Sequence, residues 1–278
     1  MRALTVFISL ILFLSGCVSE QNQTESDVLN YVDPFIGTGF HGHTFPGATT
    51  PFGMVQLSPD THIMGWDASS GYHYEDSTIY GFSHTHLSGT GIGDLGDVLL
   101  LPYSNCDELK PVGLFDKKDE TASPGYYKVR LKNLNVTAEL TATKRVGFHQ
   151  YTYDESNDRN VLLDLGHILQ PNWGHKMIEN TIHQIDDKTF EGVQKTKGWA
   201  EDQELYYAIV VSKPVEKLEI HANGKKVPGT EAEGHDVAGV LTYNTKSGET
   251  INLKVGISPV SHEAALKNIE SEIPHWDF

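Results

Sequence analysis

The sequence has little cysteine and little positive charge, and each shortage excludes a class of protein. Only Cys17 and Cys106 occur among the 278 residues, so the chain is not a scaffold held together by several disulfides. Lys and Arg number 21 against 37 Asp and Glu, which gives a formal net charge of −16. An acidic chain repels nucleic-acid phosphates, so we expect no nucleic-acid partner. Hydrophobic residues make up 38% of the chain, which is enough for a sizeable core.

The N-terminus has the pattern of an export signal. Arg2 precedes a nearly unbroken apolar stretch at residues 3–14, which is too short to span a bilayer comfortably. The sequence LSGC at residues 14–17 then resembles the processing box of bacterial lipoproteins, in which the cysteine receives the lipid. The simpler alternative is a signal peptide followed by a chance cysteine.

These features predict an exported bacterial lipoprotein of the periplasm, outer membrane or cell surface. Residues 1–17 would form the signal peptide and lipobox, with lipidation at Cys17 and a lipid anchor in the membrane. The polar residues 18–27 would form a flexible tether.

Short strand-like segments dominate the chain from Asp27 onward. In segment 126–132, Tyr127, Val129 and Leu131 alternate with charged residues, as in a strand with one buried face. Similar segments occur at residues 97–103, 136–143, 146–153, 160–165, 177–185, 189–194, 205–212, 215–222, 238–244 and 250–258. Turn residues separate many of them, and no long amphipathic helix alternates with them. We therefore predict an all-β protein, a large antiparallel β-sandwich over residues 28–262, with a hairpin over residues 240–257.

The last residues have a different pattern. Ser261 is a good N-cap, and helix formers follow it. We predict that residues 263–278 begin a linker helix. A helix that starts and then stops so soon suggests a truncated sequence, and the alternative is a natural C-terminal tail.

Glycine, proline, aromatic and polar residues concentrate in residues 31–103, and long irregular segments of this kind often carry a binding site. The most unusual stretch is GFSHTHLSGTGIGDLGD at residues 81–97. A phosphate-binding loop would be followed by a lysine or a helix start, and this stretch has no such lysine. A zinc site is a second possibility, because His84 and His86 would share one face of a strand, with Asp94 or Asp97 as a further ligand.

A sugar pocket is the third possibility. Sugars bind through aromatic surfaces and paired polar groups, and Trp66 with Asp67 offers both at adjacent positions. His84, His86 and Ser88 add donors and acceptors for hydroxyl groups. In the purely structural alternative, the histidines satisfy loop carbonyls inside a core and the tryptophan only packs.

The order of motifs in this block resembles the N-terminal region of glycoside hydrolase family 92, the bacterial exo-acting α-mannosidases. The motifs that carry the resemblance are YVDPFIGTG, FPGATTPFGMVQLSPD, GWD, SGYHY, GFSHTHLSGTG and DLGDVLLLPY. The resemblance implies an N-terminal β-sandwich packed on a C-terminal (α/α)6 barrel. It also implies inverting hydrolysis of α-mannosidic bonds with Ca²⁺, as in N-glycan degradation, with the acid, the base and most calcium ligands in the helical domain.

The resemblance therefore implies no catalytic residue on this chain. Its partners would be a mannose-containing glycan and its own helical domain. The residues expected to contribute to substrate binding are Gly47, Trp66, Asp67, His84, His86 and Ser88. The alternative is a stand-alone carbohydrate-binding sandwich without catalysis.

Overall fold

The computed structural model describes residues 28–154, 159–244 and 248–278. The predicted signal peptide, Cys17 and the tether at residues 18–27 lie outside the described residues. The chain divides into residues 1–32 and a second unit, Asp33–Phe278, and the fold below is that of the second unit. No helix among the described residues is both long enough and apolar enough to cross a membrane.

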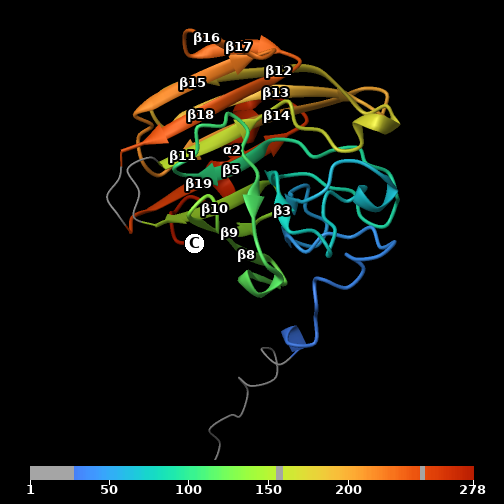
Figure 1. Ribbon diagram of the computed structural model, residues 1–278. Coiled ribbons are helices and arrows are strands. Elements are labelled where there is room, and N and C mark those ends of the chain that lie inside the picture. Colours follow the sequence, from blue (N-terminus) through green and yellow to red (C-terminus); the bar gives the residue numbers. More distant parts are fainter. Residues whose placement is uncertain (1–27, 155–158, 245–247) are drawn as a thin grey trace, which may run out of the picture. The chain divides into compact units, whose positions relative to one another are not determined.

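Two large antiparallel sheets make up the second unit (Figure 1). The first has eight strands, in the order β1 (Ala48–Thr49), β2 (Gln56–Asp60), β4 (Gly81–Ser83), β5 (Leu99–Tyr103), β11 (Arg159–Asp164), β18 (Val237–Tyr243), β15 (Lys217–Ala222) and β16 (Lys225–Val227). The second has nine strands, in the order β17 (Glu231–Gly234), β12 (Lys176–Gln184), β13 (Thr189–Lys197), β14 (Gln203–Val211), β19 (Thr250–Ser258), β10 (Val146–Tyr153), β9 (Val136–Ala142), β8 (Tyr126–Leu131) and β7 (Glu120–Ser123).

Smaller elements connect these strands. A two-stranded sheet pairs β3 (Thr78–Ile79) with β6 (Gly113–Leu114). Three short 3₁₀ turns are η1 (Trp66–Ala68), η2 (Lys117–Asp119) and η3 (Pro171–Trp173).

One hydrophobic cluster joins the facing sides of the two large sheets, which confirms the predicted sandwich. Leu100 and Leu241 of the eight-stranded sheet belong to the same buried cluster as Leu140 and Leu253 of the nine-stranded sheet. In β9, buried and half-buried side chains alternate along the whole strand, so its buried residues, including Leu140, share one face. Burial of this apolar surface is the main source of stability for a domain with no disulfide among its described residues.

The helix α2 (His262–Glu272) packs on the outer face of the nine-stranded sheet. Its N-cap is the predicted residue, because the Ser261 side chain accepts a hydrogen bond from the backbone N–H of Ala264. The helix buries Ala265 and Ile269 against Phe148. Tyr151 lies three positions further along β10, on the opposite face of the strand, and belongs to the central core instead. A Cβ at Gly256 would lie 2.3 Å from the carbonyl oxygen of Ala265, so a glycine lets the helix approach the sheet.

The predicted hairpin over residues 240–257 is wrong. β18 lies in the eight-stranded sheet and pairs with β11 and β15, whereas β19 lies in the nine-stranded sheet and pairs with β10 and β14. The chain crosses from one sheet to the other between them. Both segments form strands, but neither pairs with the other.

Candidate functional site

An exposed group of aromatic and polar side chains surrounds the turn η1. Trp66 is 49% exposed, although it is a large apolar residue. The ring of His43 packs edge-on against its indole, with 4.4 Å between the ring centroids, and the ring of His41 lies 5.7 Å away. The indole is therefore supported from below and open to solvent above, as in a platform for a flat ligand.

A carboxylate is fixed beside this indole. The Nδ1 atom of His41 lies 2.8 Å from a carboxylate oxygen of Asp67, and both side chains are partly exposed. This hydrogen bond to His41 is the main reason that the pKa of Asp67 is lowered. Asp67 therefore remains ionised and presents its second oxygen as a hydrogen-bond acceptor.

Glycine allows a neighbouring loop to approach the indole edge. A Cβ at Gly91 would lie 2.6 Å from Nε1 of Trp66 and 3.4 Å from His43, and the φ of this glycine is +67°. The same loop is tied to the platform at Gly89, whose backbone N–H donates to the carbonyl oxygen of His43. Ser88 is exposed directly before this contact, so its hydroxyl lies on the loop that borders Trp66.

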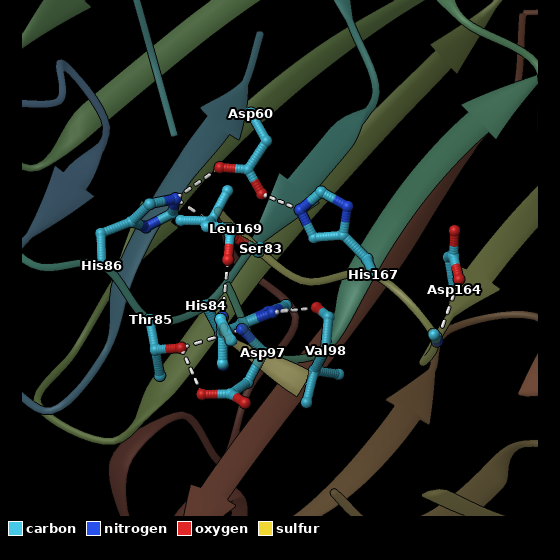
Figure 2. A network of polar contacts seen from close by, with 12 residues as sticks. Asp60, Ser83, His84, Thr85, His86, Asp97, Val98, Asp164, His167 and Leu169 are labelled. Carbon is cyan, nitrogen blue, oxygen red and sulfur yellow. Dashed lines mark hydrogen bonds and ion pairs between the residues drawn. The ribbon is translucent and has the colours of Figure 1, made fainter. Parts of the chain in front are cut away.

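Behind this surface lies a fully buried ionic group, which Figure 2 shows. The carboxylate of Asp60, the last residue of β2, lies between two imidazoles, at 2.7 Å from Nε2 of His86 and 2.7 Å from Nε2 of His167. Burial alone would raise the pKa of Asp60, but the two histidines outweigh it, and the pKa lies well below its usual range.

The hydrogen bonds of His86 hold both ends of its ring. Its Nδ1 lies 2.7 Å from the carbonyl oxygen of Gln56, which only accepts hydrogen bonds, so Nδ1 is a donor. Its Nε2 lies 2.7 Å from the Asp60 carboxylate and 3.1 Å from the hydroxyl of Ser83. His86 and Asp60 therefore form a buried pair, and the imidazole lowers the pKa of the carboxyl.

His84 belongs to a different chain of hydrogen bonds. Its Nδ1 donates to the carbonyl oxygen of Val98 at 2.7 Å, so its Nε2 accepts from Nε2 of His149 at 2.9 Å. The Nδ1 of His149 then accepts from the hydroxyl of Tyr151 at 2.7 Å. This neutral arrangement agrees with burial, which lowers the pKa of His84 to about 4 and that of His149 well below its usual value.

The candidate zinc ligands do not come together. Asp97 accepts hydrogen bonds from Thr85 and Gln203, and burial raises its pKa. Asp94 accepts instead from the backbone amides of Trp199 and Ala200. Among the residues that the structure describes, no group of three His, Cys, Asp or Glu side chains could hold a metal ion.

The structure separates the six expected site residues into two layers. Trp66, Asp67 and Ser88 lie on the exposed surface, whereas Gly47, His84 and His86 are buried. A Cβ at Gly47 would lie 2.1 Å from the carbonyl oxygen of Leu57, so this glycine permits a close approach to β2. The two histidines have no exposed surface, and their geometry is that of supports beneath the loops.

Sequence reasoning missed the long-range partners of the two histidines. His149 and His167 come from β10 and from the segment after β11, at 65 and 107 residues from His84 and Asp60. No local signal marks them, because each is a single histidine in or beside an ordinary strand.

The fold and the matched sequence define the class as the β-sandwich domain that forms the N-terminal part of a group of glycoside hydrolases. The chain belongs to glycosyl hydrolase family 92, whose N-terminal domain matches residues 31–258.

Three relatives illustrate this similarity. A family GH92 alpha-mannosidase from Bacteroides thetaiotaomicron, solved in complex with mannoimidazole, is 35% identical with a TM-score of 0.84, over 88% of this chain and 34% of that chain. An inverting mannosidase of the same family from Bacteroides thetaiotaomicron is 24% identical with a TM-score of 0.76, over 90% of this chain and 34% of that chain. At this identity the likeness supports the fold alone. An uncharacterized secreted glycosidase from Arthroderma benhamiae is 29% identical, over 92% of this chain and 36% of its own length. The chain thus spans about a third of the length of these relatives.

Proposed function

We propose that this chain is the N-terminal domain of an exported exo-α-mannosidase, and that the exposed group around Trp66 forms one wall of its mannose cavity. The observation that carries the proposal is the half-exposed indole beside a carboxylate that His41 holds in place. The apolar face of a pyranose ring would stack on Trp66, and a pair of its hydroxyl groups would donate to Asp67. The mannoimidazole bound to a relative that is 35% identical supports mannose as the sugar.

In this proposal the other expected residues act at different depths. Ser88 offers a hydroxyl at the rim of the cavity. His84, His86 and Gly47 act from below, because they fix the strands and loops on which the wall is built. Their burial makes them positioning residues.

The acid and the base are proposed to lie outside this sequence, in the helical domain of the full-length protein. Inversion requires two carboxyl groups separated by roughly 6.5–9.5 Å, with room for a water molecule. Asp94 and Asp97 are buried, with their oxygens occupied by hydrogen bonds, and Glu201 pairs with Lys197 at 2.6 Å. Asp67 remains exposed, but its proposed partner is a sugar hydroxyl.

The calcium dependence expected for the full-length protein finds no support in the described residues. Calcium takes six to eight oxygen ligands, and in the part of the chain that the structure describes no group of three acidic, histidine or cysteine side chains could hold a metal ion. We propose that any bound calcium takes its ligands mostly from the helical domain.

Export as a lipoprotein is also a proposal. The similarity to a glycosidase that is described as secreted agrees with export. The mass of the N-terminal peptide of the mature protein tests lipidation of Cys17, because an unmodified cysteine there would contradict it.

The test of the main proposal is hydrolysis of an α-mannoside by the full-length protein that contains this sequence. We expect Trp66→Ala to lower kcat/KM at least about tenfold, which corresponds to 1.4 kcal/mol of lost transition-state stabilisation. Trp66→Phe should retain part of the activity, because it keeps an aromatic surface. Ile185→Ala is the matched control, because Ile185 is also 49% exposed but lies at the turn between β12 and β13.

Three outcomes of this assay separate the possibilities. Activity of Trp66→Ala equal to wild type would contradict the proposed wall. Binding of mannose that depends on Trp66, without any hydrolysis by the full-length protein, would favour the stand-alone carbohydrate-binding module. Unchanged hydrolysis after thorough chelation would remove calcium from the proposal and leave the rest intact.

A further inference from the structure

A second cavity, of about 310 Å³, lies between two tryptophans that the proposed mannose wall does not use. Trp173 ends the turn η3 and is 49% exposed, and Trp199 lies in the loop after β13 and is 77% exposed. The other residues that line the cavity are Ile92, Gly93, Asp94, Gln170, His175 and Gly198. Its volume is at the lower end of the range for small-molecule sites.

Two buried polar atoms at this cavity have no partner. The Nδ1 atom of His175 donates to the carbonyl oxygen of Leu169 at 2.7 Å, and its Nε2 is unpaired. The amide nitrogen of Gln170 donates to the carbonyl oxygen of Gly65 at 2.5 Å, which leaves its Oε1 unpaired. His175 is only 3% exposed and Gln170 only 1%. Unpaired buried polar atoms are costly, so these two atoms call for a hydrogen-bond partner.

The walls of the cavity are held in place by specific contacts. The carboxylate of Asp94 accepts from the backbone N–H of Trp199 at 3.0 Å and of Ala200 at 2.7 Å, which fixes the loop that carries the indole. A Cβ at Gly93 would lie 1.8 Å from Cγ of Gln170, so only glycine fits there. Gln170 itself has a φ of +55°, an uncommon conformation for a residue with a side chain.

We propose that this cavity binds a neutral saccharide ring. Indole surfaces suit the C–H face of a sugar, and unpaired polar atoms suit its hydroxyl groups. No lysine or arginine is among the residues that line the cavity, and Asp94 contributes a negative charge. An anionic ligand such as a sugar phosphate therefore has no counter-charge there and would be repelled.

The proposal rests on the proposed function in one respect, because the ring would be a further unit of the same glycan.

The two sites share a border. Gly91 contacts Trp66, whereas Gly93 contacts Gln170, which is itself hydrogen-bonded to Gly65. A segment of three residues thus separates the platform around Trp66 from the cavity between Trp173 and Trp199.

Calorimetric titration of the full-length protein with methyl α-mannoside tests this inference. The Trp66→Ala variant is the starting point, so that the measured binding reports on the second cavity. In that background we expect Trp199→Ala to raise the Kd at least about tenfold, whereas Trp199→Phe should retain most of the affinity. Trp199 is 77% exposed, so its replacement leaves the fold intact.

A second variant tests the unpaired imidazole nitrogen directly. His175→Asn keeps a donor toward Leu169 and removes Nε2, so we expect Kd to rise roughly two- to tenfold, the value of one hydrogen bond. Mannose 6-phosphate should bind more weakly than methyl α-mannoside. Ile185→Ala is again the matched control, and the unfolding midpoint of each variant shows that it is folded.

Several results would overturn the inference. They are a Trp199→Ala variant that binds as tightly as its parent, a phosphorylated sugar that binds as tightly as the neutral one, or no binding once Trp66 is replaced, which would mean that the cavity holds only water. Hydrolysis that depends on Trp66, with normal binding by the cavity variants, would contradict this inference and leave the proposed function intact. Binding in the cavity by a protein without hydrolytic activity would sink only the proposed function.

Discussion

Two regions of the same sandwich are held together in different ways. The long strands between residues 126 and 258 are stabilised by alternating apolar side chains, which one central cluster buries. Residues 33–97 contain only short strands, and their interior includes Asp60, His84 and His86, all of them fully buried. The first region depends on shape and volume, and the second depends on a specific set of charges and hydrogen-bond directions.

The difference concerns which substitutions each region tolerates. An apolar core accepts residues of similar volume, because dispersion contacts have no direction. A buried ion pair does not accept a neutral residue of the same shape, because the remaining charge has lost its partner. Residues 33–97 also carry the proposed sugar surface, so here the charges and hydrogen bonds that hold the loops also set the geometry of a candidate site.

The largest expected effect comes from a pair of near-isosteric changes, one in each region. Asp60→Asn removes the buried carboxylate that pairs with His86 and His167, so we expect the free energy of unfolding to fall by about 3–5 kcal/mol. Leu253→Met in β19 preserves volume and should cost less than about 1.5 kcal/mol. Urea denaturation of the two variants and the wild type, at neutral pH, gives both values.

This comparison has a clear contrary outcome. If Asp60→Asn costs no more than Leu253→Met, the ion pair with His86 contributes little and the two regions do not differ in the way that we describe.

A smaller effect should appear as a dependence on pH. Burial lowers the pKa of His84 to about 4, whereas an unfolded histidine has a pKa near 6.5. Between these values the unfolded chain binds a proton that the folded domain does not, so stability falls as the pH falls from about 6.5 to 4. The loss attributable to His84 is about 3 kcal/mol over this range. Denaturation in urea at several pH values measures it.

Variants of two histidines sharpen this prediction. His84→Asn keeps a donor toward Val98 and removes the titrating group, so the loss of stability between pH 6.5 and 4 should shrink by about 3 kcal/mol. His235→Asn, at an exposed position, is the control and should leave the loss unchanged. Asp60 acts in a lower range, because its stabilising effect disappears only as the pH falls below its unfolded pKa of about 3.8. An equal pH dependence in the wild type and in His84→Asn would contradict the assignment.

The sequence was sufficient to predict the regular region. In β8 the expected inward residues Tyr127, Val129 and Leu131 are fully buried, and the strand bounds of β10 and β19 match the predicted ranges. A period of two identifies such strands because one face meets the core and the other does not. The N-cap at Ser261 was predicted for a similarly local reason.

The pairing of the strands could not be predicted from the sequence. The expected hairpin over residues 240–257 failed because alternation says which face of a strand is buried but not which sheet the strand joins. β19 pairs with strands that lie about 50 and 100 residues earlier in the chain. Only the packing of the whole sandwich selects these partners.

The candidate site was predicted in part. Trp66 was expected to offer an aromatic surface to a sugar, and its side chain is half-exposed. Trp173 and Trp199 also stand beside a glycine, and they line the second cavity, which the sequence analysis did not predict. The depth of His84 and His86 was left open, because it depends on His149 and His167, which only the fold brings close.

The buried carboxylate of Asp60 also joins three segments of the chain. It contacts His86, 26 residues further along the chain, and His167, 107 residues further along. Because both of its oxygens are engaged, a shift of any one of these segments strains the contacts of the other two.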